Sequence, residues 1–85
     1  MYGYFASGKR VAIVAGDPLP EGLRGLALDG ATWPTSVPLP KGLKWLSLDG
    51  GTWPESVSLP KGLKWLFLDG GTCLASVPLG CRVYP

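Results

Sequence analysis

Few residues of this chain could carry out chemistry. It has 85 residues, with eight Lys or Arg, six Asp or Glu and no His. Without an imidazole there is no general base that titrates near neutral pH, and a Ser-His or Cys-His nucleophile pair cannot form. Two cysteines without a histidine cannot make an ordinary closed zinc site. We therefore expect no enzyme, no cofactor and no metal centre.

Three aspartates, Asp29, Asp49 and Asp69, recur at a spacing of 20 residues. If the chain stacks with this period, their carboxylates lie one strand apart and repel each other, which would favour a basic partner or a calcium ion. Each aspartate also precedes a glycine, and Asp readily caps a turn through its own backbone. Turn capping, a basic partner and calcium stay open as interpretations, and the three residues count as candidate partner contacts.

The 20-residue spacing reflects an internal repeat. Three units cover 19–38, 39–58 and 59–78, the second of which reads LPKGLKWLSLDGGTWPESVS. The first two units agree at 13 of 20 positions and the last two at 15 of 20, which excludes chance. Residues 8–18 can be laid on a shortened unit, and 79–85 begin a fourth. The length predicts a single domain over 1–85, with 1–18 as an N-terminal cap.

Each unit predicts one short strand followed by an extended return. Residues 45–48 alternate in hydropathy, which places Leu46 and Leu48 on one face of a strand. An Asp-Gly-Gly turn follows at 49–51. Prolines in the return segment exclude a helix, so we expect an extended or 3₁₀ path. Equivalent strands are expected near 25–28 and 65–68.

Stacked units would form a parallel sheet with strands about 4.8 Å apart. The predicted fold is mainly β: a short right-handed β-solenoid whose stability comes from contacts between neighbouring units. The predicted core consists of columns of equivalent side chains, namely Leu23, Leu43, Leu63; Leu26, Leu46, Leu66; Leu28, Leu48, Leu68; Val37, Val57, Val77; and Leu39, Leu59, Leu79.

The unit L-x-x-L-x-L-x-G-x-x-W-x-x-x-V-x-L-P resembles the leucine-rich repeat. Its length of 20, and the LPKGL that leads into each strand, resemble the short bacterial type found in type III secretion effectors. The resemblance covers 19–78. It implies recognition of a protein by the exposed sheet face, and it implies no enzyme, because effectors with ubiquitin-ligase activity carry that activity in a separate domain. The family's Asn ladder is replaced here by Gly30, Gly50 and Gly70, which can make the bend at positive φ but offer no side-chain donor.

The face opposite the leucines supplies the main candidate site. Alternation turns Trp45, Trp65 and Phe67 outward, and Lys44 and Lys64 sit just before their strands. An exposed cluster of aromatic residues is typical of a protein interface. The alternative is that the rings only cover the sheet, either by stacking on each other or under the N-terminal segment.

The remaining predictions concern the ends of the chain and the bends. Tyr2–Phe5 and 11–14 predict a β-hairpin whose second strand caps the repeats. Trp33 and Trp53 should pack inward at the bend. Cys73 takes the same position in the third unit, so a buried free thiol is expected there, with a Cys73–Cys81 disulfide as the alternative.

These features favour a non-catalytic module that recognises or inhibits a partner protein, such as a pathogen effector fragment or a phage-encoded inhibitor of a bacterial defence enzyme. The alternative is a self-assembling structural protein, or a homodimer formed through a strand edge. A net charge of +2 is too small to suggest nucleic acid. No apolar run reaches the roughly 18 residues of a membrane span. Residues 1–16 lack the features of a signal peptide, which favours the cytoplasm of a bacterium or of its host.

Overall fold

The computed structural model describes residues 1–14 and 16–85, which form eight strands and no helix. The strands are β1 Tyr2–Phe5, β2 Arg10–Ala12, β3 Leu23–Ala27, β4 Trp45–Ser47, β5 Thr52–Trp53, β6 Trp65–Phe67, β7 Thr72–Cys73 and β8 Arg82–Tyr84. The prediction of a mainly β chain is confirmed, and the return segments of the described residues contain short strands and turns without a helix. No helix among the described residues is long and apolar enough to cross a membrane.

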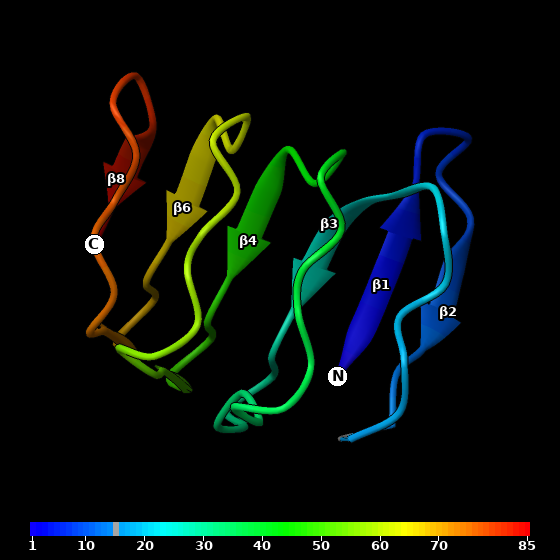
Figure 1. Ribbon diagram of the computed structural model, residues 1–85, viewed down its shortest axis with the longest axis horizontal. Coiled ribbons are helices and arrows are strands. Elements are labelled where there is room, and N and C mark those ends of the chain that lie inside the picture. The colour runs from blue at the N-terminus through cyan, green and yellow to red at the C-terminus, as the bar shows by residue number, and fades with distance from the viewer. Residues whose placement is uncertain (15) are drawn as a thin grey trace.

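A six-stranded sheet in the order β2-β1-β3-β4-β6-β8 organises the molecule (Figure 1). The strands β3, β4, β6 and β8 run parallel, so the sheet is mostly parallel, as expected. The units pair in register: Leu26 lies beside Leu46, and Leu46 beside Leu66. Each repeat therefore contributes one strand to the sheet at the same position of its unit.

The N-terminal hairpin is present, but its strands take the reverse of the expected order. β1 lies between β2 and β3 and is antiparallel to both, so the first strand of the hairpin joins the repeats and the second forms the outer edge (Figure 1). Residues 8–18 are consequently not a stacked partial unit. The amide of Phe5 donates to the carbonyl of Lys9, and a tight turn at 6–8 closes the hairpin.

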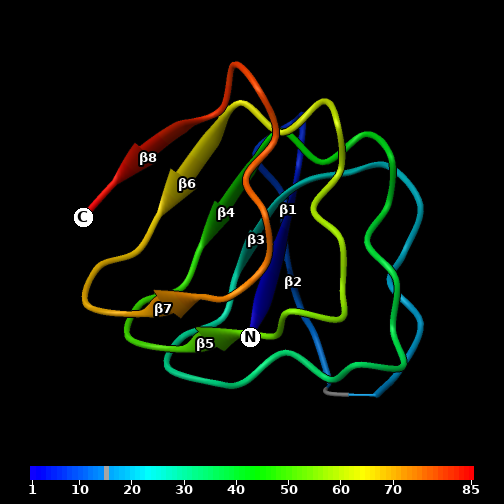
Figure 2. The same ribbon diagram turned by 60° about the vertical axis from the view of Figure 1, so that its left-hand side comes forward.

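The core lies between the sheet and the return segments, which Figure 2 shows on opposite sides of the molecule. Leu26, Leu46 and Leu66 are fully buried, which confirms the inward leucine face. Trp33 and Trp53 are also buried at the bend, as predicted. Their indole Nε1 atoms donate to the carbonyls of Val37 and Val57 at 2.9 Å, so each ring closes its own return segment while satisfying its polar atom.

The bend after each strand is a tight turn built by Asp-Gly. In the second unit Asp49 and Gly50 both have positive φ, at 46° and 83°. The Gly51 amide donates to the Leu48 carbonyl at 2.7 Å, which completes a type I′ turn. The Gly51 carbonyl then accepts the Thr72 amide of the next unit at 3.0 Å. Backbone hydrogen bonds between units thus hold the bend without a side-chain donor.

The second glycine of each Asp-Gly-Gly turn allows neighbouring units to stack closely. A Cβ on Gly51 would overlap the Ala31 carbonyl oxygen, and one on Gly71 would overlap that of Gly51. The first unit carries Ala31 at this position. No repeat precedes that unit, so the carbonyl that requires glycine at 51 and 71 has no equivalent from a preceding repeat there.

The C-terminal register differs from the prediction, because the third return segment is two residues shorter than the others. Val77 is 39% exposed and Leu79 fully exposed, so neither belongs to the core columns as expected. Ala75 is buried and takes the place of Val57. The Cys73 thiol donates to the Ala75 carbonyl, two residues later in the chain, whereas the Trp53 indole donates to the Val57 carbonyl, four residues later. Residues 75–81, ASVPLGC, therefore correspond to 57–63, VSLPKGL. The fourth strand, β8, follows this shortened path.

Candidate protein-binding face

Aromatic side chains line the sheet face that points away from the core. We call this surface the outer aromatic face and define it by Tyr4, Trp45, Trp65, Phe67 and Tyr84, from strands β1, β4, β6 and β8. It arises from alternation, because Leu46 and Leu66 face the core and turn their neighbours outward. The outward direction of Trp45, Trp65 and Phe67 is confirmed.

Trp45 is half-buried because the N-terminal strands cover it. A Cβ on Gly25, its partner on β3, would overlap the Trp45 indole, so the ring lies flat against the bare glycine backbone. The Tyr4 ring approaches from β1 with its centroid 5.1 Å from that of Trp45. At this position the covering interpretation is correct: Trp45 completes the packing of the sheet.

Trp65, in contrast, is 40% exposed, and it borders a shallow recess of about 530 Å³. The recess is lined by Trp45, Ser47, Trp65, Phe67 and Tyr84. Phe67 and Tyr84 stack with centroids 5.1 Å apart and planes inclined by 15°. The stacked pair and the two indoles thus surround the Ser47 position with apolar surface. An inserted apolar side chain would find aromatic contacts there and one hydroxyl.

Comparison with known proteins gave no match. No family model, no curated protein and no solved structure resembles this chain closely enough to show its family. The function must therefore be argued from the site itself.

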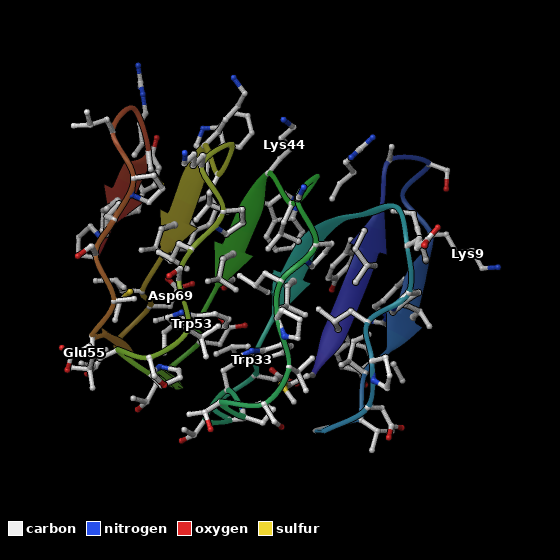
Figure 3. All side chains as sticks on the ribbon, viewed as in Figure 1. Lys9, Trp33, Lys44, Trp53, Glu55 and Asp69 are labelled. Atoms are coloured by element: carbon white, nitrogen blue, oxygen red, sulfur yellow. The ribbon has the colours of Figure 1, made fainter. Side chains whose placement is uncertain are left out.

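The charged candidates lie at the two ends of the strands and not in the recess. Lys44 and Lys64 stand at the strand starts, where the Lys64 amide bonds the Lys44 carbonyl at 2.8 Å. Arg24 precedes them and Arg82 follows, so four cations form one column. The aspartates occupy the turns at the strand ends. Figure 3 shows Lys44 at the upper end of the strands and Asp69 nearer the lower end.

The three aspartates are exposed and sit in the turns, with φ between 44° and 59°. Their place in the turn is explained by the backbone, since Asp tolerates the left-handed region better than most residues. No group of three or more His, Cys, Asp or Glu that could hold a metal ion occurs in residues 1–14 and 16–85.

Both cysteines are free thiols and half-buried, so the expected full burial of Cys73 is wrong. Burial raises the pKa of Cys73 above its ordinary value. Burial also raises the pKa of Cys81, and the charge of the Cys73 thiolate adds to this effect. A raised pKa keeps a thiol protonated and so does not favour nucleophilic chemistry.

Sequence reasoning missed two residues of the outer aromatic face. Tyr84 was hidden because 79–85 were laid on the repeat without a gap. Aligning ASVPLGC with VSLPKGL accounts for two missing residues but still sets Tyr84 opposite Leu66. One further residue is missing between Cys81 and Arg82, and this brings Tyr84 beside Phe67. The sequence pattern places Tyr4 in the hairpin but assigns it to no face of the sheet. Its place over Trp45 depends on the order of β1 and β2 in the sheet, which the local pattern does not encode.

Proposed function

We propose that this protein is a short β-solenoid of the leucine-rich-repeat type that binds another protein through its outer aromatic face, without catalysis. The in-register parallel strands, one per unit, and the leucines buried beneath them support the solenoid. The backbone ladder at the Asp-Gly turns supplies the bend without asparagine.

One observation carries the binding proposal. The outer aromatic face is covered at its N-terminal half, where Tyr4 meets Trp45, and open at its C-terminal half, where Trp65 is 40% exposed beside the recess. A tryptophan in this setting removes much apolar surface from water when a partner covers it. Tryptophan is also enriched among the residues that dominate interface energies.

The chemistry of the surface defines the partner class. The recess accepts an apolar or aromatic side chain, and the cation column of Arg24, Lys44, Lys64 and Arg82 borders the same sheet at the strand starts. A protein loop that presents an apolar residue flanked by carboxylates fits both features, since surface charges steer association. A defence enzyme of a bacterium, or a host protein met by an effector, is a candidate of this kind.

The test is affinity capture with an exposed-ring variant. The intact chain, a Trp65→Ala/Phe67→Ala variant and a Leu79→Ala control are immobilised and exposed to bacterial lysate and to animal-cell lysate. Leu79 is fully exposed and does not line the recess, so Leu79→Ala removes exposed apolar surface from the protein without altering the site. Truncating one dominant ring typically costs about 2 kcal/mol or more, or roughly 30-fold in affinity.

We expect at least one protein to be retained by the intact chain and by Leu79→Ala but lost by the face variant, while the circular dichroism spectra of all three agree. Retention that survives in the face variant would place recognition elsewhere. A face variant that unfolds would show that the two rings are structural. The lysate in which the partner appears separates a bacterial target from a host target.

A further inference from the structure

The last strand of the sheet has an open edge with apolar surroundings. β8 pairs only with β6, and no other described strand lies beyond it (Figure 1). Val83 is 45% exposed and Tyr84 39% exposed. Most other large exposed apolar residues also belong to the C-terminal part of the chain, namely Leu74, Val77 and Leu79.

The backbone of β8 has one residue whose hydrogen-bonding groups face outward. Arg82 donates its amide to the Lys64 carbonyl at 2.8 Å, and the Tyr84 carbonyl accepts the Leu68 amide at 2.8 Å. Both residues are thus turned toward β6. Because successive residues of a strand direct their backbone groups to opposite sides, the Val83 N–H and C=O point away from the sheet. They form a free donor and a free acceptor at the edge.

We propose that β8 pairs antiparallel with β8 of a second copy of this chain, about a two-fold axis at Val83. The two Val83 residues then exchange both of their backbone hydrogen bonds, as directly opposed residues do in an antiparallel pair. Arg82 of each copy lies opposite Tyr84 of the other, where the guanidinium can lie over the ring. The same residue types already meet at the other end of the sheet, where Arg10 lies 4.6 Å from the centroid of the Tyr2 ring.

The charge distribution selects this arrangement over head-to-tail stacking. Cations occupy the strand starts and aspartates the strand ends, so an antiparallel join brings Lys64 and Arg82 of one copy toward Asp69 of the other. A parallel join of β8 onto the opposite edge, β2, would instead set Arg82 near Lys9 and Arg10, and like charges on adjacent strands repel. The two-fold contact also closes on itself, whereas the head-to-tail contact would propagate.

The dimer would be weak and reversible, because three-residue strands bury little area. It would make the two sheets continuous and place both outer aromatic faces on one surface. The proposal does not require the binding function, since it rests on the backbone edge of β8 at Val83, although Tyr84 belongs both to this edge and to the recess.

Sedimentation equilibrium on the full chain, from about 10 µM to about 1 mM, tests the association. Val83→Pro removes the outward N–H without touching the bonds of Arg82 and Tyr84 to β6, and Val83→Thr keeps that N–H as the matched control. We expect a monomer–dimer equilibrium for the wild type and for Val83→Thr, and a monomer throughout for Val83→Pro. A wild-type monomer at all concentrations, open-ended growth, or a dimer that persists in Val83→Pro would each overturn the proposal.

Crosslinking tests the register without relying on stability. In a background with Cys73→Ser and Cys81→Ser, Val83→Cys would bring two thiols together across the axis. The Cα atoms of such a pair lie about 5.5 Å apart, within the range of a disulfide. Arg82→Cys is the control, since residue 82 faces residue 84 of the second copy. Mild oxidation should give a covalent dimer with Val83→Cys and much less with Arg82→Cys; equal yields would contradict the register.

Discussion

The two ends of the sheet differ in whether another part of the chain covers the last repeat. At the N-terminal end, strand β3 shows only Gly25 and Ala27 on its outer face, and β1 pairs with it so that Tyr4 lies opposite Gly25. At the C-terminal end, β8 has large residues of its own and no covering strand. Repeats need capping units at both ends, because a stacked core is otherwise exposed to water. The first end is capped by the chain itself, while the second leaves its apolar residues available for a partner.

The difference also divides the outer aromatic face. Both tryptophans line the recess, but Trp45, next to the capped end, is half-buried against the Gly25 backbone and Tyr4, whereas Trp65, nearer the open end, is 40% exposed. Two tryptophans at the same position of consecutive repeats therefore have different roles, because their neighbours toward the N-terminus differ. On the strand toward the N-terminal end, the partner of Trp45 is Gly25, whereas the partner of Trp65 is Trp45.

The largest expected effect concerns the buried leucine row. Leu46→Ala, in the central unit, should cost about 2–5 kcal/mol in the free energy of unfolding, the usual range for a buried leucine. Val83 lies two strands along the same row but is 45% exposed, so Val83→Ala in the monomer should cost about 1 kcal/mol or less. Urea denaturation at low protein concentration measures both. Equal losses would mean that the open end is as well packed as the centre.

The second-largest loss of stability is expected from substitution of Gly25, at the capped end of the sheet. Gly25→Ala should cost about 1–3 kcal/mol, because the new methyl group displaces the Trp45 ring from the backbone. The same substitution in a Trp45→Ala background should cost much less, since the obstructing ring is gone. A double-mutant cycle measured by denaturation gives the coupling between the two positions. Additive losses would show that the ring does not rest on Gly25.

A smaller difference in stability is expected between substitutions of Trp45 and of Trp65. Trp45→Ser should destabilise the fold by about 1–2 kcal/mol more than Trp65→Ser, since only the first ring packs on Gly25 and Tyr4. The denaturation midpoints of the two variants give the difference directly. If Trp65→Ser proved the more harmful, the exposed ring would be structural and the binding proposal would lose its main support.

The smallest effect is on the pH dependence of stability. Burial raises the pKa of both thiols above about 9.0, so the folded state holds its thiol protons to higher pH than the unfolded chain. The resulting stability is complete below pH 9 and is lost as the pH rises through the raised values. Relative to a Cys73→Ala/Cys81→Ala variant, the wild type should therefore lose stability more steeply as the pH rises above about 9. Parallel stability curves for the two proteins would contradict the assignment.

Much of the central fold could be predicted from the sequence, because it is local and repeated. Alternation at 45–48 placed Leu46 inside and Trp45 outside, and the Asp-Gly pair fixed the turn after each strand. These features depend on residues a few positions apart, and the 20-residue period presents each of them three times. The outward direction of the candidate residues followed from the same logic.

The ends could not be predicted in the same way, because they break the period. A two-residue gap in the third return segment moved Val77 and Leu79 out of the core, and one further missing residue just before β8 brought Tyr84 beside Phe67. At the other end, either hairpin strand could have joined β3. The choice of β1 depends on packing across the sheet: Gly3 lies against Leu23 so closely that a Cβ there would clash, whereas the sequence pattern treats both strands alike.

Amide hydrogen exchange, resolved by residue and measured at a concentration low enough for monomers, tests the contrast between the two ends most directly. The Phe5 amide, bonded to Lys9 in the cap, and the Leu68 amide, bonded to Tyr84, should both be protected, while the Val83 amide should exchange rapidly. That pattern would show a sheet closed at one end and open at the other. A protected Val83 amide in the monomer, or unprotected amides at Phe5 and Leu68, would contradict the account.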